Sequence, residues 1–330
     1  MRKSKMLTFR VGVCAAMACT SCWAQNPTAA YPTKPVTIVL PYTPGALADL
    51  ETRLYIPSLT EALGHPVIVD YKPGAGTSIG TIHVAKAAPD GYTILRASAG
   101  FTMYPAFFPA DKLPYDPIKN FAPVSMIAKV SAFLVVHPSL GVKTFPEYLA
   151  YAKANPEKIN FGTVGGGSNY HIAGAWLHSA TNTKVTFVHY KGVGPMQTDL
   201  LAGRVTAAPG VPFNIASHVK SGKLIALANM GAERSGYFPD IKTIVEYGVK
   251  EYDYVSWSGY LVPARTPEAI VTRLSAAFAK VAKSPDVIKK MASDGAEMVG
   301  STPEQFHQTL LTETIRWRKI VQQNDMKMEE

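Results

Sequence analysis

Residues 36–49 read VTIVLPYTPGALAD, and later segments repeat the pattern that they set. Val36–Leu40 is a continuous apolar, β-branched run, which is typical of a strand buried on both faces. The turn Pro41–Asp49 then leads into Leu47–Leu63, a predicted helix that Pro57 should kink or split. A helix start leaves backbone N–H groups without intrahelical partners, and carboxylates and phosphates bind there. This turn is therefore a candidate rim of an anion pocket.

A second turn of the same kind, Pro73–Gly80, follows the predicted strand Val67–Asp70 and opens the predicted helix Ile79–Ala88. Tyr92–Ala97 is the next strand, so the order β-α-β-α-β predicts a parallel sheet. Both turns would lie at the carboxyl ends of neighbouring strands, where open α/β sheets hold their ligands. A lone glycine turn more often only reverses the chain, but two at adjacent strand ends favour a ligand site.

The pattern starts again further along the chain, which predicts a second lobe. Two apolar strands, Pro123–Ile127 and Ser131–His137, lead into it, and Tyr254–Val262 can carry the chain back. A chain of 330 residues also exceeds what one hydrophobic core usually organises. We predict an α/β protein whose lobes comprise residues 31–127 with 260–330, and residues 128–259. The two crossing strands would form a hinge, and the cleft between the lobes is the expected binding site.

The second lobe offers its own candidate residues. Gly165 to Asn169 form a glycine turn in which Ser168 is a predicted N-cap, although a flexible loop without a ligand would look the same. His171 could donate to an anion or be a structural histidine. In the first turn, Asp49 could orient the loop by accepting its N–H groups or could simply cap the helix.

Residues 1–24 have the features of a signal peptide cleaved near Ala24. A short apolar core, Val11–Ala18, follows a positive segment and is too short to span a bilayer. A lipoprotein is less favoured because no Leu stands three residues before Cys19 or Cys22. The leader's cations are Arg2, Lys3, Lys5 and Arg10, and their loss lowers the formal net charge from +9 to +5.

All three cysteines, Cys14, Cys19 and Cys22, lie in this leader. The mature chain would then have no disulfide, cysteine ligand or cysteine nucleophile. Its mild positive charge would favour an anionic ligand, although ordinary surface composition produces the same charge.

Motifs of catalysis are missing from the sequence. It has no Gly-x-Ser-x-Gly elbow, His-Glu-x-x-His helix, phosphate loop or Gly-x-Gly-x-x-Gly turn, and its eight histidines are scattered. Basic residues do not alternate with aromatic ones in a stripe, so nucleic-acid binding is not expected. We therefore predict no catalytic residue, no metal site and no cofactor.

Several segments together resemble the Bug family, the periplasmic solute-binding receptors of tripartite tricarboxylate transporters. These segments extend in order from Tyr31 to Trp317. They are Tyr31-Pro-x-Lys-Pro35, Pro44-Gly45 to Asp49, Pro73-Gly-Ala-Gly76, Ala87-Ala-Pro-Asp-Gly-Tyr-Thr93, Leu113-Pro-Tyr-Asp-Pro117, Asn120-Phe-Ala-Pro-Val124, Tyr190-Lys-Gly192 and Thr302-Pro-Glu-Gln-Phe306.

The resemblance implies a two-lobed periplasmic-binding-protein (Venus flytrap) fold, with two parallel-rich sheets joined by two crossover strands. It also implies a monomeric periplasmic receptor that holds a small carboxylate and hands it to membrane permease subunits. A receptor that presents its ligand to a membrane sensor kinase is an alternative. The ligand-binding residues that it implies are Tyr42, Thr43, Gly45, Ala46, Ala48, Asp49, Gly76, Thr77, Ser78, Ser98, Gly165, Gly166, Ser168, Asn169, His171, Gly210 and Val211.

The sequence departs from the family pattern where a ligand's amine would bind. The second-lobe strand after Val205 commonly ends in an acid in this family, whereas this chain has Gly210. Loss of that carboxylate disfavours an amino acid and would leave room beside Pro209 and Val211. The resemblance therefore implies an amine-free dicarboxylate, which the added room would allow to be aromatic, such as a phthalate-type diacid. An amino acid or another monocarboxylate is the alternative ligand.

Overall fold

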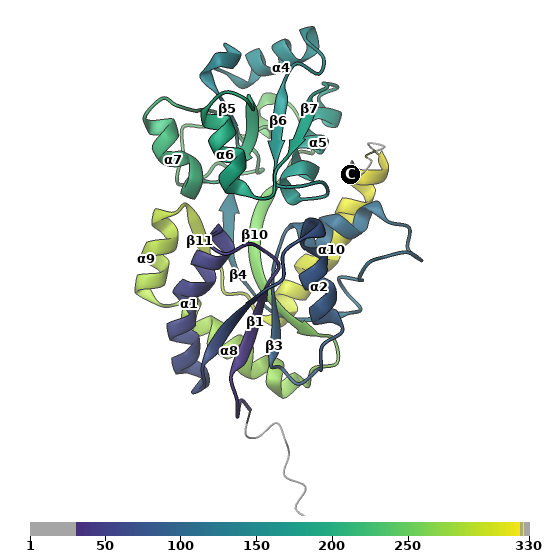
Figure 1. Cartoon of the computed structure of the whole chain (residues 1–330), viewed down its shortest axis with the longest axis vertical. Coiled ribbons are helices and arrows are strands. Elements are labelled where there is room, and N and C mark those ends of the chain that lie inside the picture. The colour runs from purple at the N-terminus through teal and green to yellow at the C-terminus, as the bar shows by residue number, and fades with distance from the viewer. Residues whose placement is uncertain (1–30, 324–325, 327–330) are drawn as a thin grey trace, which may run out of the picture.

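The computed structural model describes residues 31–323 and residue 326. The predicted signal peptide and its cleavage site lie outside these residues. Two lobes, each built on one β-sheet with flanking helices, stand one above the other in Figure 1. The predicted two-lobed α/β architecture is therefore confirmed.

The first lobe, lower in Figure 1, contains a six-stranded sheet with strand order β11-β4-β10-β3-β1-β2. Its strands are β1 (Val36–Leu40), β2 (Val67–Tyr71), β3 (Thr93–Ser98), β4 (Phe121–Ser131), β10 (Val255–Pro263) and β11 (Ala296–Met298). Its helices are α1 (Leu47–Leu63), α2 (Ser78–Ala85), α3 (Gly100–Met103), α8 (Glu268–Ala282), α9 (Pro285–Ser293) and α10 (Pro303–Gln323), with short 3₁₀ turns η1 (Ala75–Thr77) and η2 (Tyr104–Phe107). α1 runs through Pro57 as one helix, so the predicted split does not occur.

The second lobe contains a five-stranded sheet with strand order β7-β6-β8-β5-β9. Its strands are β5 (Phe133–Val136), β6 (Asn160–Thr163), β7 (Thr186–His189), β8 (Ala207–Gly210) and β9 (Ile225–Asn229). Its helices are α4 (Phe145–Ala154), α5 (Asn169–Ala180), α6 (Val193–Leu201) and α7 (Pro212–Lys220), with 3₁₀ turns η3 (Pro138–Leu140) and η4 (Val245–Tyr247).

Both sheets are mixed. β1 pairs in parallel with β2 and β3, and β6 pairs in parallel with β7 and β8. The strands next to the hinge run the other way: β10 is antiparallel to β3 and β4, and β5 is antiparallel to β8 and β9. Because the parallel strands of each lobe end toward the other lobe, the turns that follow them meet between the lobes (Figure 1).

Two passages of chain join the lobes side by side. The chain leaves the first sheet through Ala132 and returns to it after Tyr254. Met230 links the passages, because its N–H donates to the Ala132 carbonyl and its carbonyl accepts from the Tyr254 N–H, both at 2.8 Å. β4 and β10 belong to the first sheet over their whole length, so we propose that the lobe boundaries lie near Ala132 and Tyr254.

The C-terminal helix holds the lobes together on one side. α10 rises from the first lobe toward α5 of the second (Figure 1). Trp317 of α10 packs edge-on against Trp176 of α5, with ring centroids 5.3 Å apart, and Trp176 stacks on Tyr252 at 4.4 Å. All three side chains are buried, so part of the apolar core spans the two lobes.

Candidate functional site

The turn after β1 is held in shape by a buried carboxylate. Asp49 Oδ2 accepts from the Gly45 N–H at 2.8 Å, and Gly45 has the positive φ of 78° that such a turn requires. Asp49 Oδ1 accepts from Arg53 Nε at 2.8 Å and from the Tyr71 hydroxyl at 2.7 Å. Burial would raise the pKa of Asp49, but these donors hold it below its usual value. Of the two predicted roles, the geometry favours orientation of the loop.

The start of α1 presents unused backbone donors. The Ala46 N–H donates to the Thr43 carbonyl at 3.3 Å, and the helix's own bonding begins with the Asp49 N–H. Within residues 31–323 and 326, no group accepts from the N–H of Leu47 or Ala48. These two amides, at the positive end of the α1 dipole, are the donors that an anion would use.

The second turn has an unusual backbone. Gly74, Ala75, Gly76 and Thr77 all have positive φ, at 120°, 44°, 59° and 79°. Such values are uncommon for alanine and threonine, and strained backbone of this kind clusters at ligand sites. The Thr77 N–H closes the turn on the Gly74 carbonyl at 3.0 Å, and the buried Ser78 begins α2.

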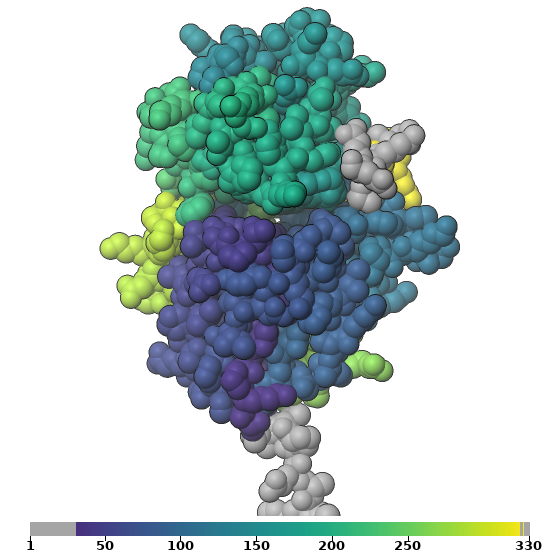
Figure 2. All heavy atoms as spheres, viewed as in Figure 1, coloured from purple at the N-terminus to yellow at the C-terminus, as the bar shows by residue number. Residues whose placement is uncertain are grey.

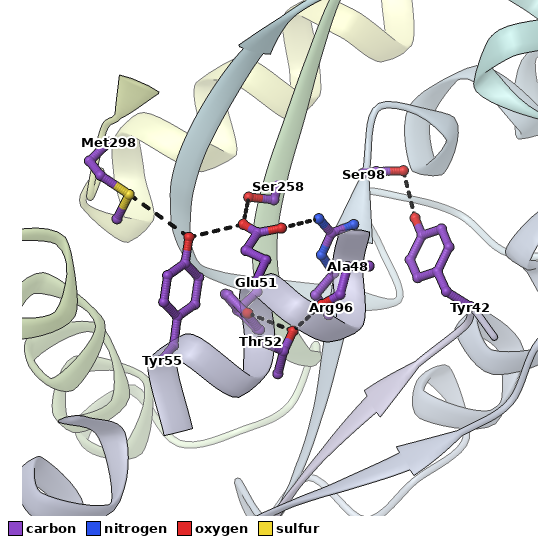
Figure 3. A network of polar contacts seen from close by, with 10 residues as sticks. Tyr42, Ala48, Glu51, Thr52, Tyr55, Arg96, Ser98, Ser258 and Met298 are labelled. Carbon is purple, nitrogen blue, oxygen red and sulfur yellow. Dashed lines mark hydrogen bonds and ion pairs between the residues drawn. The ribbon is translucent and has the colours of Figure 1, made fainter. Parts of the chain in front are cut away.

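A third strand end joins the first turn. Ser98, the last residue of β3, is buried, and its hydroxyl accepts from the Tyr42 hydroxyl at 2.6 Å (Figure 3). Tyr42 is thereby fixed beside Ser98, so these two predicted site residues lie together at one edge of the sheet.

The glycine turn of the second lobe is supported from beneath by His171. Gly165 and Gly167 have positive φ, and the Ser168 hydroxyl caps α5 by accepting from the His171 N–H at 3.2 Å. His171 Nδ1 accepts from the Gly167 N–H at 3.1 Å. Burial and the neighbouring His189 lower the pKa of His171 to about 4, so the ring is neutral at pH 7. Of the two predicted roles for His171, the geometry therefore favours the structural one, in which the ring supports the turn.

The turns of the two lobes face each other across the seam that Figure 2 shows between the lobes. A β-carbon built on Gly76 would lie 3.5 Å from the Gly166 carbonyl oxygen. One on Gly100 would lie 3.8 Å from the Asn169 nitrogen, and one on Gly192 would lie 3.9 Å from Thr43 Oγ1. Asn169 also donates to the Tyr254 hydroxyl at 2.8 Å, which ties this turn to the hinge.

The space expected beside Gly210 is filled. A β-carbon on Gly210 would come within 2.3 Å of Ile215 Cγ2, because α7 folds back over the end of β8. The prediction of free room at this position is therefore wrong. Val211 is buried and donates its N–H to Asn214 Oδ1 at 2.9 Å, as the first residue of the turn into α7.

A buried ion pair next to the first turn was not predicted. Arg96 of β3 and Glu51 of α1 approach to 2.5 Å, and both are almost fully buried (Figure 3). Glu51 Oε1 also accepts from the hydroxyls of Ser258 and Tyr55. The sequence did hold a signal, because Arg96 is the one charged residue of the predicted strand Tyr92–Ala97.

Two hollows lie near the hinge, and both are lined in part by Trp257 and Ala296. The smaller, about 40 Å³, is on the side of the turns and is lined by Leu47, Glu51, Arg96, Val211 and Ser258, among others. The larger, about 960 Å³, lies on the α10 side and is lined by charged residues that include Lys129, Asp253, Glu313 and Arg316. None of the predicted site residues lines the larger hollow.

Within the described part of the chain, no three His, Cys, Asp or Glu side chains gather in a way that could hold a metal ion. No helix of residues 31–323 has both the length and the apolar character needed to cross a bilayer.

The cap of α5 gives a first testable expectation. Replacing Ser168 with Ala should lower the free energy of unfolding by about 0.5–2 kcal/mol, because the His171 N–H loses its acceptor. Urea unfolding without ligand measures this loss. Thr144→Ala is the matched control, since Thr144 caps α4 through the same contact to the Glu147 N–H. Only Ser168→Ala should also weaken ligand binding, and equal affinities for both variants would remove Ser168 from the proposed site.

Two α/β lobes on a double-stranded hinge, with opposed glycine turns between them, define a two-lobed solute-binding receptor. The sequence profile described as tripartite tricarboxylate transporter family receptor matches residues 52–326. The chain belongs to this family, and the resemblance to Bug receptors is confirmed.

Relatives and solved structures agree over nearly the whole chain. A UPF0065 protein from the TAR-I ttuE-ttuC' intergenic region of Agrobacterium vitis is 35% identical over 302 residues, which cover 91% of this chain and 87% of the relative. BugT of Bordetella pertussis is 32% identical over 298 residues, which cover 90% of this chain and 91% of BugT. The structure of the periplasmic binding protein BugD aligns with a TM-score of 0.83 at 29% identity, covering 91% of this chain and 100% of BugD.

Two similar structures were solved with a ligand. Rpa4515 of Rhodopseudomonas palustris, with adipate, has a TM-score of 0.82 at 31% identity and covers 90% of this chain and 99% of its own. MatC of the same organism, with bound malate, has a TM-score of 0.82 at 28% identity. The alignment covers 88% of this chain and 100% of MatC.

Proposed function

We propose that this chain is a periplasmic receptor that captures an amine-free dicarboxylate between its lobes and delivers it to the permease of a tripartite tricarboxylate transporter. One observation carries the proposal. The free amides of Leu47 and Ala48 begin α1, just after Thr43, which faces Gly192 of the second lobe, and the strained turn at Gly76 faces the glycine turn at Gly166. Such convergent backbone donors favour an anion.

The choice of ligand class draws on two supports. The ligands named for the two similar structures, adipate and malate, are dicarboxylates without an amine. In this chain the end of β8 is Gly210, which provides no carboxylate for a ligand's ammonium group. The space beside Gly210, which would have accommodated an aromatic ring, is filled by Ile215. We therefore favour an aliphatic diacid.

The other parts of the proposal are those that the resemblance to the family implies. They are a periplasmic location after removal of the leader, a monomeric state, membrane permease subunits as partners, and binding without turnover. Ligand contact is proposed through the turns at residues 42–49, 76–78 and 165–169, with Asp49 and His171 as supports of the turns.

A thermal-shift screen of the purified mature protein tests the ligand class. A ligand that binds only the native state stabilises it by about 2.7 kcal/mol at a hundredfold excess over Kd. We expect adipate or another aliphatic diacid to raise the melting temperature more than glutamate does. Tighter binding of glutamate in calorimetry would contradict the amine-free assignment, and no response to any carboxylate would contradict the receptor proposal.

Delivery to a permease and presentation to a sensor kinase differ in a genetic test. The gene for this chain is deleted and the permease is expressed constitutively, with the diacid as the carbon source. A transport receptor predicts that growth stays impaired. Restored growth would favour the sensor role.

A further inference from the structure

The small cavity of about 40 Å³ lies where the two lobes meet, close to the proposed ligand site. Leu47, one of its lining residues, carries a free amide at the start of α1, and Val211 comes from the start of α7 in the other lobe. The cavity is therefore bounded by both lobes and by the ion pair of Arg96 and Glu51. Its volume suits one small polar group, since a water molecule takes about 30 Å³ in the liquid.

Arg96 gives this cavity unused hydrogen-bond donors. Its side chain is 7% exposed, and only Nη2 has a partner, the Glu51 carboxylate. Nε is buried without any acceptor, and among the described residues none accepts from Nη1 either. In Figure 3 the second terminal nitrogen of Arg96 points away from Glu51. A buried guanidinium with free N–H groups is a strong site for an anionic acceptor.

The acids around the cavity are already paired. Glu51 accepts from Arg96, Ser258 and Tyr55, and Asp294 is held by Lys290 Nζ at 2.7 Å. The ring of Tyr42 covers another side of Arg96, with 5.2 Å from the guanidinium carbon to the ring centroid. The groups left without partners are therefore donors, and a carboxylate complements them better than an ammonium or an apolar end does.

We propose that this cavity receives the second carboxylate of the ligand, with Arg96 as its charge partner, while the first carboxylate lies at the backbone amides of the turns. This inference rests on the proposed function and deepens it. Arg96 becomes the residue that distinguishes diacids from monoacids, and Glu51 competes with the ligand for the same guanidinium.

Two variants should change affinity in opposite directions. Glu51→Gln keeps an acceptor of similar shape but removes the charge that neutralises Arg96, so a diacid should bind more tightly. The double variant Glu51→Gln, Arg96→Gln leaves no buried charge unpaired. It should bind a diacid about tenfold to a hundredfold more weakly, which corresponds to the loss of a hydrogen bond to a charged group. It should bind a monoacid as the native chain does.

Calorimetry measures the preference for a diacid over a monoacid. The ligands are adipate, succinate and suberate, each compared with its monomethyl ester. The control is the double variant Arg234→Gln, Glu246→Gln, which removes an exposed Arg–Glu ion pair on the second lobe. We expect the control to prefer the diacid over its ester as the native chain does, and the Arg96 double variant to lose that preference.

The outcomes separate this inference from the proposed function. If the Arg96 double variant still prefers the diacid, the cavity holds only water and the inference is wrong, while the receptor role stands. If the native chain binds neither diacids nor monoesters, the proposed function fails and the inference falls with it.

Discussion

Replacing Glu51 with Leu is expected to lower the free energy of unfolding by about 3–5 kcal/mol, because it leaves the Arg96 guanidinium buried without a counterion. Burial by itself would lower the pKa of Arg96, but the Glu51 carboxylate raises it, so the charge persists in the folded state. The substitution also strips the hydroxyls of Ser258 and Tyr55 of their acceptor. Urea unfolding of the ligand-free protein measures the loss.

A second variant shows whether the unpaired charge is the cause. Glu51→Leu combined with Arg96→Met removes both charges and should recover most of the lost stability, since a buried pair is often replaceable by apolar groups. If the double variant is as unstable as Glu51→Leu alone, packing around α1 and not the charge explains the loss.

The second large expected effect is a loss of stability in mild acid through buried histidines. The pKa of His171 falls to about 4 through burial and His189, and burial lowers the pKa of His178 to about 3, from an ordinary value of 6.5. Between pH 6.5 and these values the unfolded chain binds protons that the folded chain does not. The stabilising effect is complete above pH 6.5 and falls with pH. For His171 the stability lost by pH 4 is on the order of 3 kcal/mol.

Unfolding free energies measured from pH 7 to pH 4 test this expectation. His171→Asn keeps an acceptor near the Gly167 N–H but cannot be protonated, so its stability should fall less with pH than that of the native chain. His65→Asn, at a partly exposed position before β2, is the control and should follow the native curve. Identical slopes for all three proteins would show that His171 is not the group that titrates.

Local sequence patterns were sufficient for most of the fold. The continuous β-branched run Val36–Leu40 has the bounds of β1, and the predicted helix Leu47–Leu63 has the bounds of α1. The three-residue strand β11 was not predicted, because its Ala296–Met298 is too short to show alternation and pairs with β4, far away in sequence.

The site was less predictable because parts of it depend on contacts between distant residues. The glycines at 74 and 76 indicate a tight turn, but the residue types of Ala75 and Thr77 give no sign of the positive φ that both adopt. Glu51 and Arg96 are 45 residues apart, so neither position alone reveals the ion pair. Ile215 fills the space at Gly210 because of the tight turn into α7, which residue types alone do not specify.

Backbone amides from the two lobes are proposed to bind one carboxylate together. Amide chemical shifts of isotope-labelled protein, followed during titration with adipate, test it most directly. We expect the amides of Leu47, Ala48 and Gly76 in the first lobe to shift together with those of Gly166 and Asn169 in the second, with one common affinity. Saturable binding of adipate that leaves the amides of both sets unmoved would contradict it.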